Sequence, residues 1–163
     1  SYKVNYAHLV PPILLLLVKS PIVKEYDLSS LRMVTSSAAP LSTRLVTDIF
    51  EIYNIHVKQG YGLTEASPLI TLVDEKNIVQ GIMRFDILKA KIISEDGKEL
   101  GCNEPGELCI RGPNVMKGYL NNKEATDSSF DKDGFFHTGD VVTIDSQGNL
   151  FIVDRVKELI KYK

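Results

Sequence analysis

The sequence contains only two cysteines and no long apolar run, and both features narrow the class of protein. Two cysteines are too few for the disulfide framework of a small secreted domain. Cys102 and Cys109 also lack the spacing of a zinc or thiol redox motif, and no Asn-x-Ser/Thr glycosylation acceptor occurs. We therefore expect two free thiols and a reducing intracellular setting, either cytoplasmic or peroxisomal.

Membrane-spanning and nucleic-acid-binding proteins are the next classes that the sequence disfavours. The apolar run Ile13–Val18 is well short of the roughly 20 residues that a bilayer requires, and it follows Pro11 and Pro12. It predicts a buried helix, and we recognise no targeting signal at either end of the chain. The formal net charge of -2 provides no basic stripe for nucleic acid.

The composition is that of a globular protein, with 44% hydrophobic and 25% charged residues in 163. Residues 1–78 predict an α/β part in which short strands alternate with helices. The expected strands lie within Val4–Val10, Leu31–Thr35 and Ile55–Lys58. One helix begins at Pro11-Pro12, and a second is capped by Ser42. The second helix gathers its apolar residues on one face, namely Leu45, Val46, Ile49, Phe50 and Tyr53.

Residues 79–153 consist of short strand-like runs separated by turn residues, a pattern that predicts an antiparallel sheet or a small distorted barrel. Four strand-like runs are Lys89–Ser94, Gly106–Arg111, Val141–Asp145 and Leu150–Val153. Turn signals separate them at Asp96-Gly97, Asp133-Gly134 and Gln147-Gly148-Asn149. A short helix is expected within Asn121–Phe130, capped by Asn121 or Asn122. We expect residues 154–163 to form a separate terminal segment.

The run from Gln59 to Glu65 concentrates groups that can bind a nucleotide. Gly60 and Gly62 flank Tyr61, so the backbone of this loop can take positive φ and approach a ligand closely. We expect Tyr61 to Glu65 to lie just beyond the carboxyl end of a strand. The ring of Tyr61 can lie on a base, the Thr64 hydroxyl suits a phosphate oxygen, and the Glu65 carboxylate suits Mg²⁺. The alternative is a polar turn whose tyrosine packs on the core.

Asp140 and Arg155 are candidates for binding a ribose. Asp140 follows Gly139 at the start of a predicted strand, where its carboxylate can accept hydrogen bonds from both ribose hydroxyls. The alternative is a turn aspartate that satisfies its own backbone. The planar guanidinium of Arg155 suits a ribose hydroxyl or a phosphate beside Asp140. The alternative for Arg155 is a surface pair with Asp154 or Glu158.

Several motifs occur in the order typical of one family. They are Thr35–Leu41, Gln59–Glu65, Gly106-Glu107-Leu108 through Arg111-Gly112-Pro113, Gly118-Tyr119, Glu124-Ala125-Thr126, His137–Asp140 and Asp154–Lys163. In this order they resemble the adenylate-forming superfamily of AMP-dependent synthetases and ligases, above all coumarate–CoA ligases and insect luciferases. The resemblance implies an α/β part followed by a distorted antiparallel β-barrel part, ending at the interdomain hinge.

The resemblance also implies a role for each candidate residue. Gly60, Tyr61 and Gly62 would hold adenine, Thr64 the α-phosphate, Glu65 Mg²⁺, and Asp140 with Arg155 the ribose. Lys157 would be the hinge, and Lys161 would serve the second half-reaction, although spacing alone favours a solvated charged end for both. One wall of the acyl pocket would be formed by His8, Ser37, Ala38, Ala39 and Pro40. A lone histidine is more often structural, and small residues also suit a plain strand-to-helix turn.

Two segments depart from the family pattern. Ser37 stands where relatives usually carry glycine, and Gly81–Asp86 is shortened relative to a glycine-containing turn. The function implied is an ATP-dependent acid–CoA ligase that uses ATP, Mg²⁺, CoA and a carboxylic acid. We expect a phosphate loop and a C-terminal domain to lie outside this chain, which would leave it little or no activity alone. The alternatives are a non-catalytic remnant, an adenylate-binding module and a luciferase-like monooxygenase.

Overall fold

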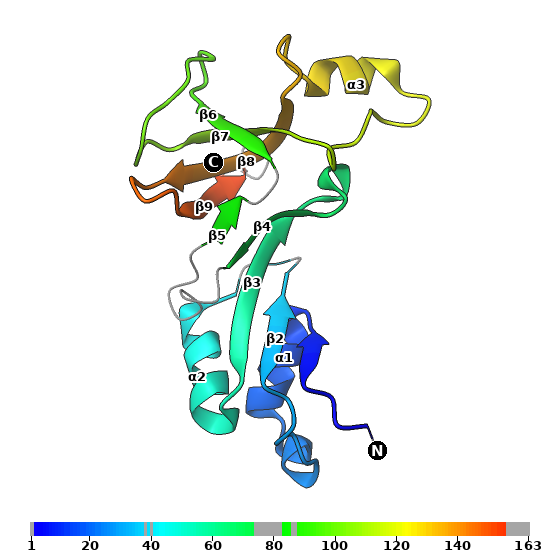
Figure 1. The fold of residues 1–163 in the computed structure, drawn as a ribbon, viewed down its shortest axis with the longest axis vertical. Helices are drawn as coiled ribbons and strands as arrows, with labels where there is room; N and C mark the ends of the chain where they lie inside the picture. Colours follow the sequence, from blue (N-terminus) through cyan, green and yellow to red (C-terminus); the bar gives the residue numbers. More distant parts are fainter. Residues whose placement is uncertain (1, 38, 40, 74–82, 86–87, 156–163) are drawn as a thin grey trace, which may run out of the picture. The chain divides into compact units, whose positions relative to one another are not determined.

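The structure is a computed structural model that describes residues 2–37, 39, 41–73, 83–85 and 88–155. The chain forms two compact units, one of Ser1–Leu63 and Leu69–Met83 and the other of Thr64–Pro68 and Arg84–Lys163. Helices and strands are mixed throughout, which agrees with the predicted α/β fold class (Figure 1). The predicted boundary between residues 78 and 79 lies outside the described residues.

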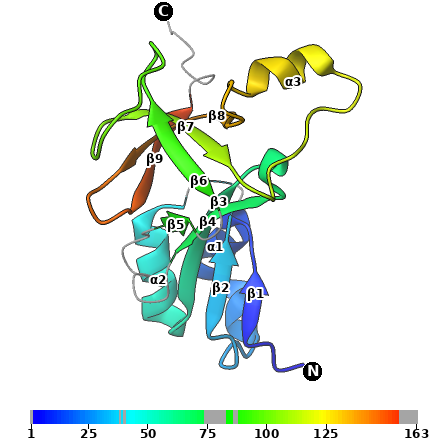
Figure 2. The ribbon, with the colours of Figure 1, turned by 45° about the horizontal axis from the view of Figure 1, so that its top comes forward.

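Four neighbouring strands form the centre of the first unit. Their order is β1 (Tyr6–His8), β2 (Met33–Ser36), β3 (His56–Gly62) and β4 (Leu69–Val73). The first three strands are parallel, with Val34 opposite Val57, and β4 runs antiparallel to β3 (Figures 1 and 2). The first three strands agree with prediction in place, whereas β4 was not predicted. β3 extends four residues beyond Lys58 because β4 pairs with its second half.

Helix α2 (Thr43–Tyr53) forms as predicted, except that Phe50 of its predicted apolar face is 41% exposed. The Ser42 hydroxyl accepts a hydrogen bond from the Leu45 amide at 3.3 Å, and this bond caps one of the free N–H groups of the first turn. Asn54 ends the helix in the left-handed region with φ of 56°. The apolar face packs with residues of α1, β2 and β3 in one core of Leu14, Val34, Leu45, Val46, Ile49, Ile55 and Val57.

Helix α1 (Pro11–Lys19) begins at the proline pair as predicted, but the prediction that it is buried is wrong. Leu14 is its only buried residue, whereas Leu15 and Leu16 are 42% and 51% exposed. A helix that packs on one layer buries a single stripe, so an apolar run does not bury its whole circumference. A 3₁₀-helix, η1 (Pro21–Glu25), follows it. No helix among the described residues has the length and apolar character to cross a membrane.

The second unit contains four antiparallel strands, as its short strand-like runs and turn residues predict. Its strands run in the order β9 (Leu150–Arg155), β8 (Phe136–Ile144), β7 (Gly106–Arg111) and β6 (Lys89–Ile93). The predicted turns hold Gly97, Gly134 and Gly148 at φ between 76° and 81°, a region that glycine enters without strain. In the described strands the sheet is open between β6 and β9, so the predicted barrel is not closed.

Three smaller elements complete the structure. The short helix α3 (Lys123–Ser129) is capped by Asn122, whose side-chain oxygen accepts a hydrogen bond from the Ala125 amide at 3.0 Å. This resolves the predicted choice between Asn121 and Asn122. The 3₁₀-turn η2 (Thr64–Ala66) begins one residue after the end of β3, and β5 (Met83–Phe85) is a short strand. Apart from β5, the shortened segment Gly81–Asp86 lies outside the described residues.

Candidate functional site

The glycines of the predicted nucleotide loop lie in a strand, not in a loop. Gly60 and Gly62 belong to β3, opposite Leu72 and Leu69, and neither has a positive φ. The predicted loop conformation is therefore wrong, since pairing with β4 keeps this backbone extended. Tyr61 is 9% exposed and lies opposite Thr71.

The backbone of Gly60 lies close to side chains of β4 and to Ser37. A Cβ built there would lie 3.3 Å from Leu69 Cδ1 and 3.8 Å from Ser37 Cβ. The second distance places Ser37, just after β2, beside the glycine of β3. Ser37 and Ala39 are exposed, as a pocket wall requires, whereas the Ser36 hydroxyl is buried with no hydrogen-bond partner among the described residues. Ala38 and Pro40 lie outside the described residues.

Glu65 is the best-anchored residue of the predicted site. The Tyr119 hydroxyl donates a hydrogen bond to Glu65 Oε1 at 2.9 Å, and the backbone oxygen of Glu65 accepts one from the Met116 amide at 2.7 Å. Asn114 Nδ2 donates to the backbone oxygen of Ala66 at 2.8 Å. The segment that follows β7 thus fixes η2 and orients its carboxylate within the second unit.

Tyr119 is a functional candidate that sequence reasoning missed. It lies 54 residues from Glu65, so no local spacing links the two side chains, although Gly118-Tyr119 was among the matched motifs. Partial burial, the hydrogen bond to Glu65 and its negative charge raise the pKa of the Tyr119 hydroxyl. The hydroxyl therefore remains a hydrogen-bond donor at neutral pH. Thr64, the other polar residue of η2, is exposed.

Glu65 fits the chemistry of a magnesium site. It is a half-buried carboxylate with one oxygen held by Tyr119, and a single carboxylate plus substrate phosphates is a usual environment for Mg²⁺. Glu65 would hold the ion together with the phosphate oxygens of ATP, and the ion would offset the charge that develops on those oxygens.

Asp140 lies inside β8, because this strand begins at Phe136 and not at Val141 as predicted. Its side chain is 3% exposed, and its amide donates a hydrogen bond to Thr138 Oγ1 at 3.1 Å. Gly139, with φ of 72°, and a register shift between Val141 and Val142 interrupt the regular ladder around it. Such irregularities can aim a side chain away from the regular pleat.

Arg155 occupies the position opposite Asp140 in the β8–β9 ladder. The two backbone positions are thus neighbours in the ladder, and the shared role at a ribose stays a prediction. Arg155 is the last residue of β9, and Lys157 and Lys161 lie outside the described residues.

His8 is an exposed residue of β1, opposite Thr35 of β2. Its ring contacts Tyr6 edge-on, with 5.0 Å between ring centroids. The hydroxyl of Tyr6 in turn forms a hydrogen bond with the hydroxyl of Thr35. His8 thus belongs to a small polar group at the open face of this strand.

The candidate residues divide between the two units. His8, Ser37, Gly60, Tyr61 and Gly62 belong to the first, and Thr64, Glu65, Asp140 and Arg155 to the second. The structure brings Gly60 and Ser37 together in one unit, and the positions of Asp140 and Arg155 together in the other. That all of them bind one nucleotide stays a prediction.

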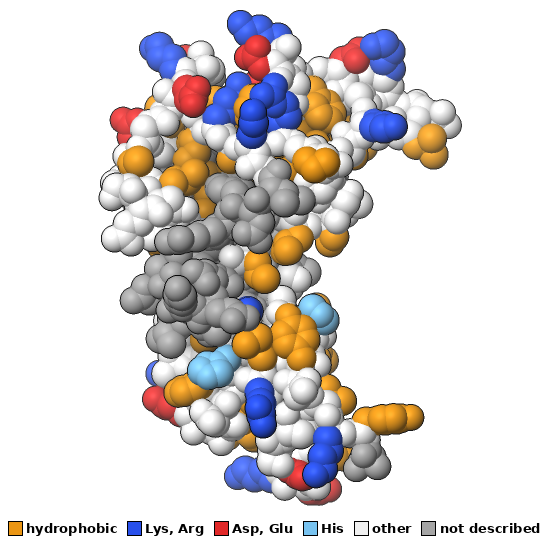
Figure 3. Space-filling view, viewed as in Figure 1, with side chains coloured by type: hydrophobic (Ala, Val, Ile, Leu, Met, Phe, Trp, Pro, Cys, Tyr) orange, Lys and Arg blue, Asp and Glu red, His pale blue; other side chains and the backbone are white. Residues whose placement is uncertain are grey.

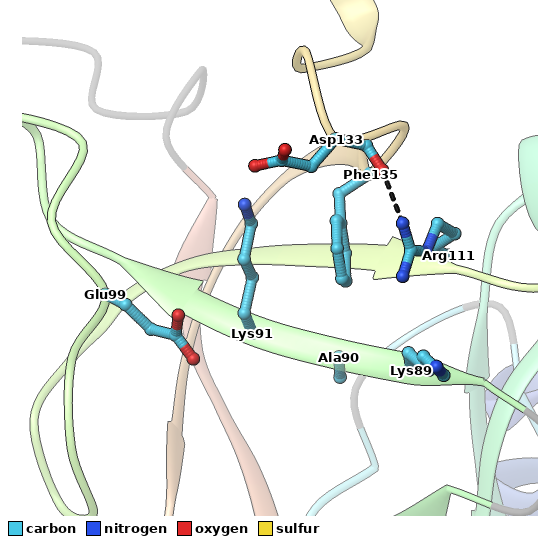
Figure 4. A pocket seen from close by; sticks show the side chains of 7 residues that line it. All are labelled: Lys89, Ala90, Lys91, Glu99, Arg111, Asp133 and Phe135. Carbon is cyan, nitrogen blue, oxygen red and sulfur yellow. Dashed lines mark hydrogen bonds between the residues drawn. The ribbon is translucent and has the colours of Figure 1, made fainter.

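The second unit also contains a cavity of about 610 Å³ that none of the predicted site residues line. Figure 4 shows Phe135 in this cavity between Lys91 and Arg111, which lie 4.5 and 4.6 Å from the centre of its ring. Basic side chains gather on this unit in Figure 3. Lys91 is paired with Asp131 at 2.6 Å, and Arg111 Nη1 donates to the backbone oxygen of Asp133 at 2.6 Å. Lys91 and Arg111, two of the basic residues that line the cavity, are therefore already paired with acceptors within the protein.

Comparison with known proteins gives one consistent result. The family model described as "AMP-binding enzyme" matches residues 1–120. The probable 4-coumarate–CoA ligase 2 of Dictyostelium discoideum is 49% identical over the whole chain, which spans 30% of that relative's length. A long-chain-fatty-acid–CoA ligase of Archaeoglobus fulgidus has a similar structure, with a TM-score of 0.82 and 36% identity over 95% of this chain and 35% of its own. The luciferase-like enzyme of the mealworm Zophobas morio has a TM-score of 0.84 and 28% identity, over 98% of this chain and 39% of its own.

Proposed function

Because the chain belongs to the family of AMP-binding enzymes, we propose that it carries nucleotide-binding residues of an ATP-dependent acid–CoA ligase. In the first step of such a reaction the substrate carboxylate attacks the α-phosphate of ATP, and pyrophosphate leaves. In the second, the thiol of CoA attacks the acyl carbonyl of the adenylate, and AMP leaves. Neither step needs a protein nucleophile, so the protein contributes position and charge.

The observation that carries this proposal is the anchoring of Glu65. Its carboxylate is held by the Tyr119 hydroxyl, and its own backbone oxygen is held by the Met116 amide. A metal-binding carboxylate that is fixed in advance needs no further ordering when the nucleotide arrives.

The remaining roles are proposed from chemistry and position. Tyr61 would stack on adenine, between the backbones of Gly60 and Gly62, and Thr64 would donate its hydroxyl to the α-phosphate. Asp140, with Arg155 opposite it in the ladder, would bind the ribose hydroxyls. Asp140 is 3% exposed, and a shielded carboxylate forms stronger hydrogen bonds than one in water.

The acid and the cellular setting are proposed from the relatives. Relatives named 4-coumarate–CoA ligases are 45–50% identical to this chain, whereas the fatty-acid ligase is 36% identical. We therefore propose an aromatic propenoic acid as the first substrate class to test, with CoA as the acceptor. Cys102 and Cys109 are both free, as predicted, which suits a reducing intracellular compartment.

Isothermal calorimetry with a non-hydrolysable coumaroyl-adenylate analogue tests the ribose assignment. We expect saturable 1:1 heat from the chain and at least about tenfold weaker binding for Asp140→Asn, because a charged hydrogen bond contributes about 1.5–3 kcal/mol. Glu51→Gln, on the exposed side of α2, is the matched control. Absence of heat from the folded chain, or equal affinity for Asp140→Asn, would refute the assignment.

Titration with ATP at increasing Mg²⁺ tests Glu65 separately. Glu65→Gln should weaken the binding of Mg²⁺-ATP and leave the affinity for the adenylate analogue, which needs no metal, nearly unchanged. If both affinities fell equally, Glu65 would be a structural residue and the magnesium role would be lost.

A further inference from the structure

Three potential metal ligands converge on β7 and β8, apart from the proposed nucleotide residues. Glu107 and Cys109 are two positions apart on β7, so their side chains project from the same face of the strand. His137 of β8 lies directly opposite Cys109 in the ladder. Their ligand atoms all lie within 4.8 Å of one another.

The distances between these atoms approach those of a tetrahedral site. Cys109 Sγ lies 3.7 Å from His137 Nδ1, and His137 Nδ1 lies 2.9 Å from Glu107 Oε2. Bond lengths of about 2.3 Å to sulfur and 2.0–2.2 Å to nitrogen and oxygen require separations of about 3.6 and 3.4 Å at tetrahedral angles. The sulfur–nitrogen distance already agrees, and the carboxylate has to withdraw by about half an ångström.

The surroundings orient the ligands and leave one side open. Glu107 Oε1 accepts a hydrogen bond from the Gly139 amide at 3.0 Å, which leaves Oε2 directed at the imidazole. Such a second partner is typical of carboxylates that bind metals. The side chains of Glu107 and His137 are 25% and 29% exposed, whereas Cys109 is fully buried. An ion can therefore enter past the first two residues, with the thiol as the floor of the site.

From this geometry we propose that Glu107, Cys109 and His137 form a binding site for a borderline-soft divalent cation such as Zn²⁺. A thiolate, an imidazole and a carboxylate are the ligand types that Zn²⁺ and Co²⁺ share, whereas Mg²⁺ prefers oxygen alone. Burial and the charge of Glu107 raise the pKa of the Cys109 thiol to about 12, so the entering ion has to displace the thiol proton to solvent. The thiolate and the carboxylate then neutralise the charge of the bound ion. The site is chemically distinct from the magnesium role proposed for Glu65.

Titration of the full 163-residue chain with Co²⁺ tests the site. Thiolate coordination should give a sulfur-to-cobalt charge-transfer absorption that saturates at one equivalent and survives excess Mg²⁺. Cys109→Ser should abolish this band, whereas the exposed Cys102→Ser should retain it in full. His137→Gln should weaken Co²⁺ binding at least about tenfold, since even the partners of ligands contribute 10–100-fold.

A substitution could remove the absorption band simply by unfolding the chain, so the effect of Zn²⁺ on the melting temperature of each variant is measured as well. Zn²⁺ should raise the melting temperature of the wild type and of Cys102→Ser, but not that of Cys109→Ser or Glu107→Gln. The proposal fails if the folded wild type shows no charge-transfer band. It also fails if Cys109→Ser keeps the band, or if Cys102→Ser loses it. In those cases His137 and Glu107 form a hydrogen-bonded pair and Cys109 is a core residue.

Discussion

A methyl group on Gly106, the first residue of β7, would collide with the strand beside it. The added Cβ would lie 2.6 Å from Leu100 Cδ1 and 2.8 Å from Ile92 Cγ2, and it would overlap the backbone oxygen of Ile93. The leucine tip can rotate away. The carbonyl of Ile93 cannot, because it belongs to the backbone of β6, so Gly106→Ala has to push β6 and β7 apart.

We expect this change to destabilise the chain by about 1–3 kcal/mol, the usual range for overpacking a filled interior. Loss of glycine from the unfolded chain stabilises by about 0.4–1 kcal/mol and only partly offsets the collision. Gly101→Ala is the matched control, because its Cβ would meet nothing closer than Glu104 Oε2 at 3.5 Å. The control should therefore change stability by no more than about 0.5 kcal/mol, or raise it slightly.

Urea unfolding followed by circular dichroism measures both variants. Gly106→Ala should lower the midpoint with little change in slope, whereas Gly101→Ala should not lower it. Equal midpoints for the two variants would show that β6 yields without cost, and the close packing inferred for Gly106 would be refuted.

Three further predictions concern stability in the same assay. Asn122→Ala should destabilise by about 1 kcal/mol through loss of the α3 cap, and Asn122→Asp should retain most of the stability. Thr71→Val should be neutral or stabilise by up to about 1–3 kcal/mol, because the buried Thr71 hydroxyl has no hydrogen-bond partner among the described residues; a clear loss would contradict this. Asp131→Asn should cost about 1–2 kcal/mol between pH 5 and 9, since Asp131 pairs with Lys91 at 2.6 Å. Burial acts to raise the pKa of Asp131, but hydrogen bonds from Lys91 and the backbone outweigh it and lower that pKa, and the bond to Asp131 raises the pKa of Lys91. The pair therefore contributes fully above about pH 5, and its contribution falls as the pH drops through the lowered carboxyl pKa. It falls again above about pH 10 as Lys91 loses its proton, so a pH-independent cost would contradict the pairing.

Local rules predicted the parts of the fold whose cause is local. The Ser42 hydroxyl accepts a hydrogen bond from an amide only three residues further along the chain. The proline pair occupies the first positions of the helix that it begins. Gly97, Gly134 and Gly148 mark their turns in the same way. These features can be read from adjacent residues because each depends on the conformation of one short segment.

The reading of Gly60 and Gly62 failed for the opposite reason. Whether glycine marks a loop or a strand with a close neighbour depends on what lies beside it. Here the neighbours are Leu69 and Leu72 of β4, which keep the segment extended. The seven residues of the motif contain no signal that predicts the pairing of β3 with β4. The same limit applies to β8, whose pairing with β7 extends it back to Phe136.

Sheet register decides whether the metal cluster exists at all, which is why cysteine and histidine spacing did not predict it. Cys109 and His137 are 28 residues apart and meet only because β7 and β8 pair them directly. A slip of one residue would turn His137 to the other face of the sheet and separate it from Glu107 as well. The register also sets the hydrogen bond from the Gly139 amide to Glu107, one residue before Asp140. The pairing that assembles the proposed zinc site is therefore the same pairing that positions the backbone next to the proposed ribose ligand.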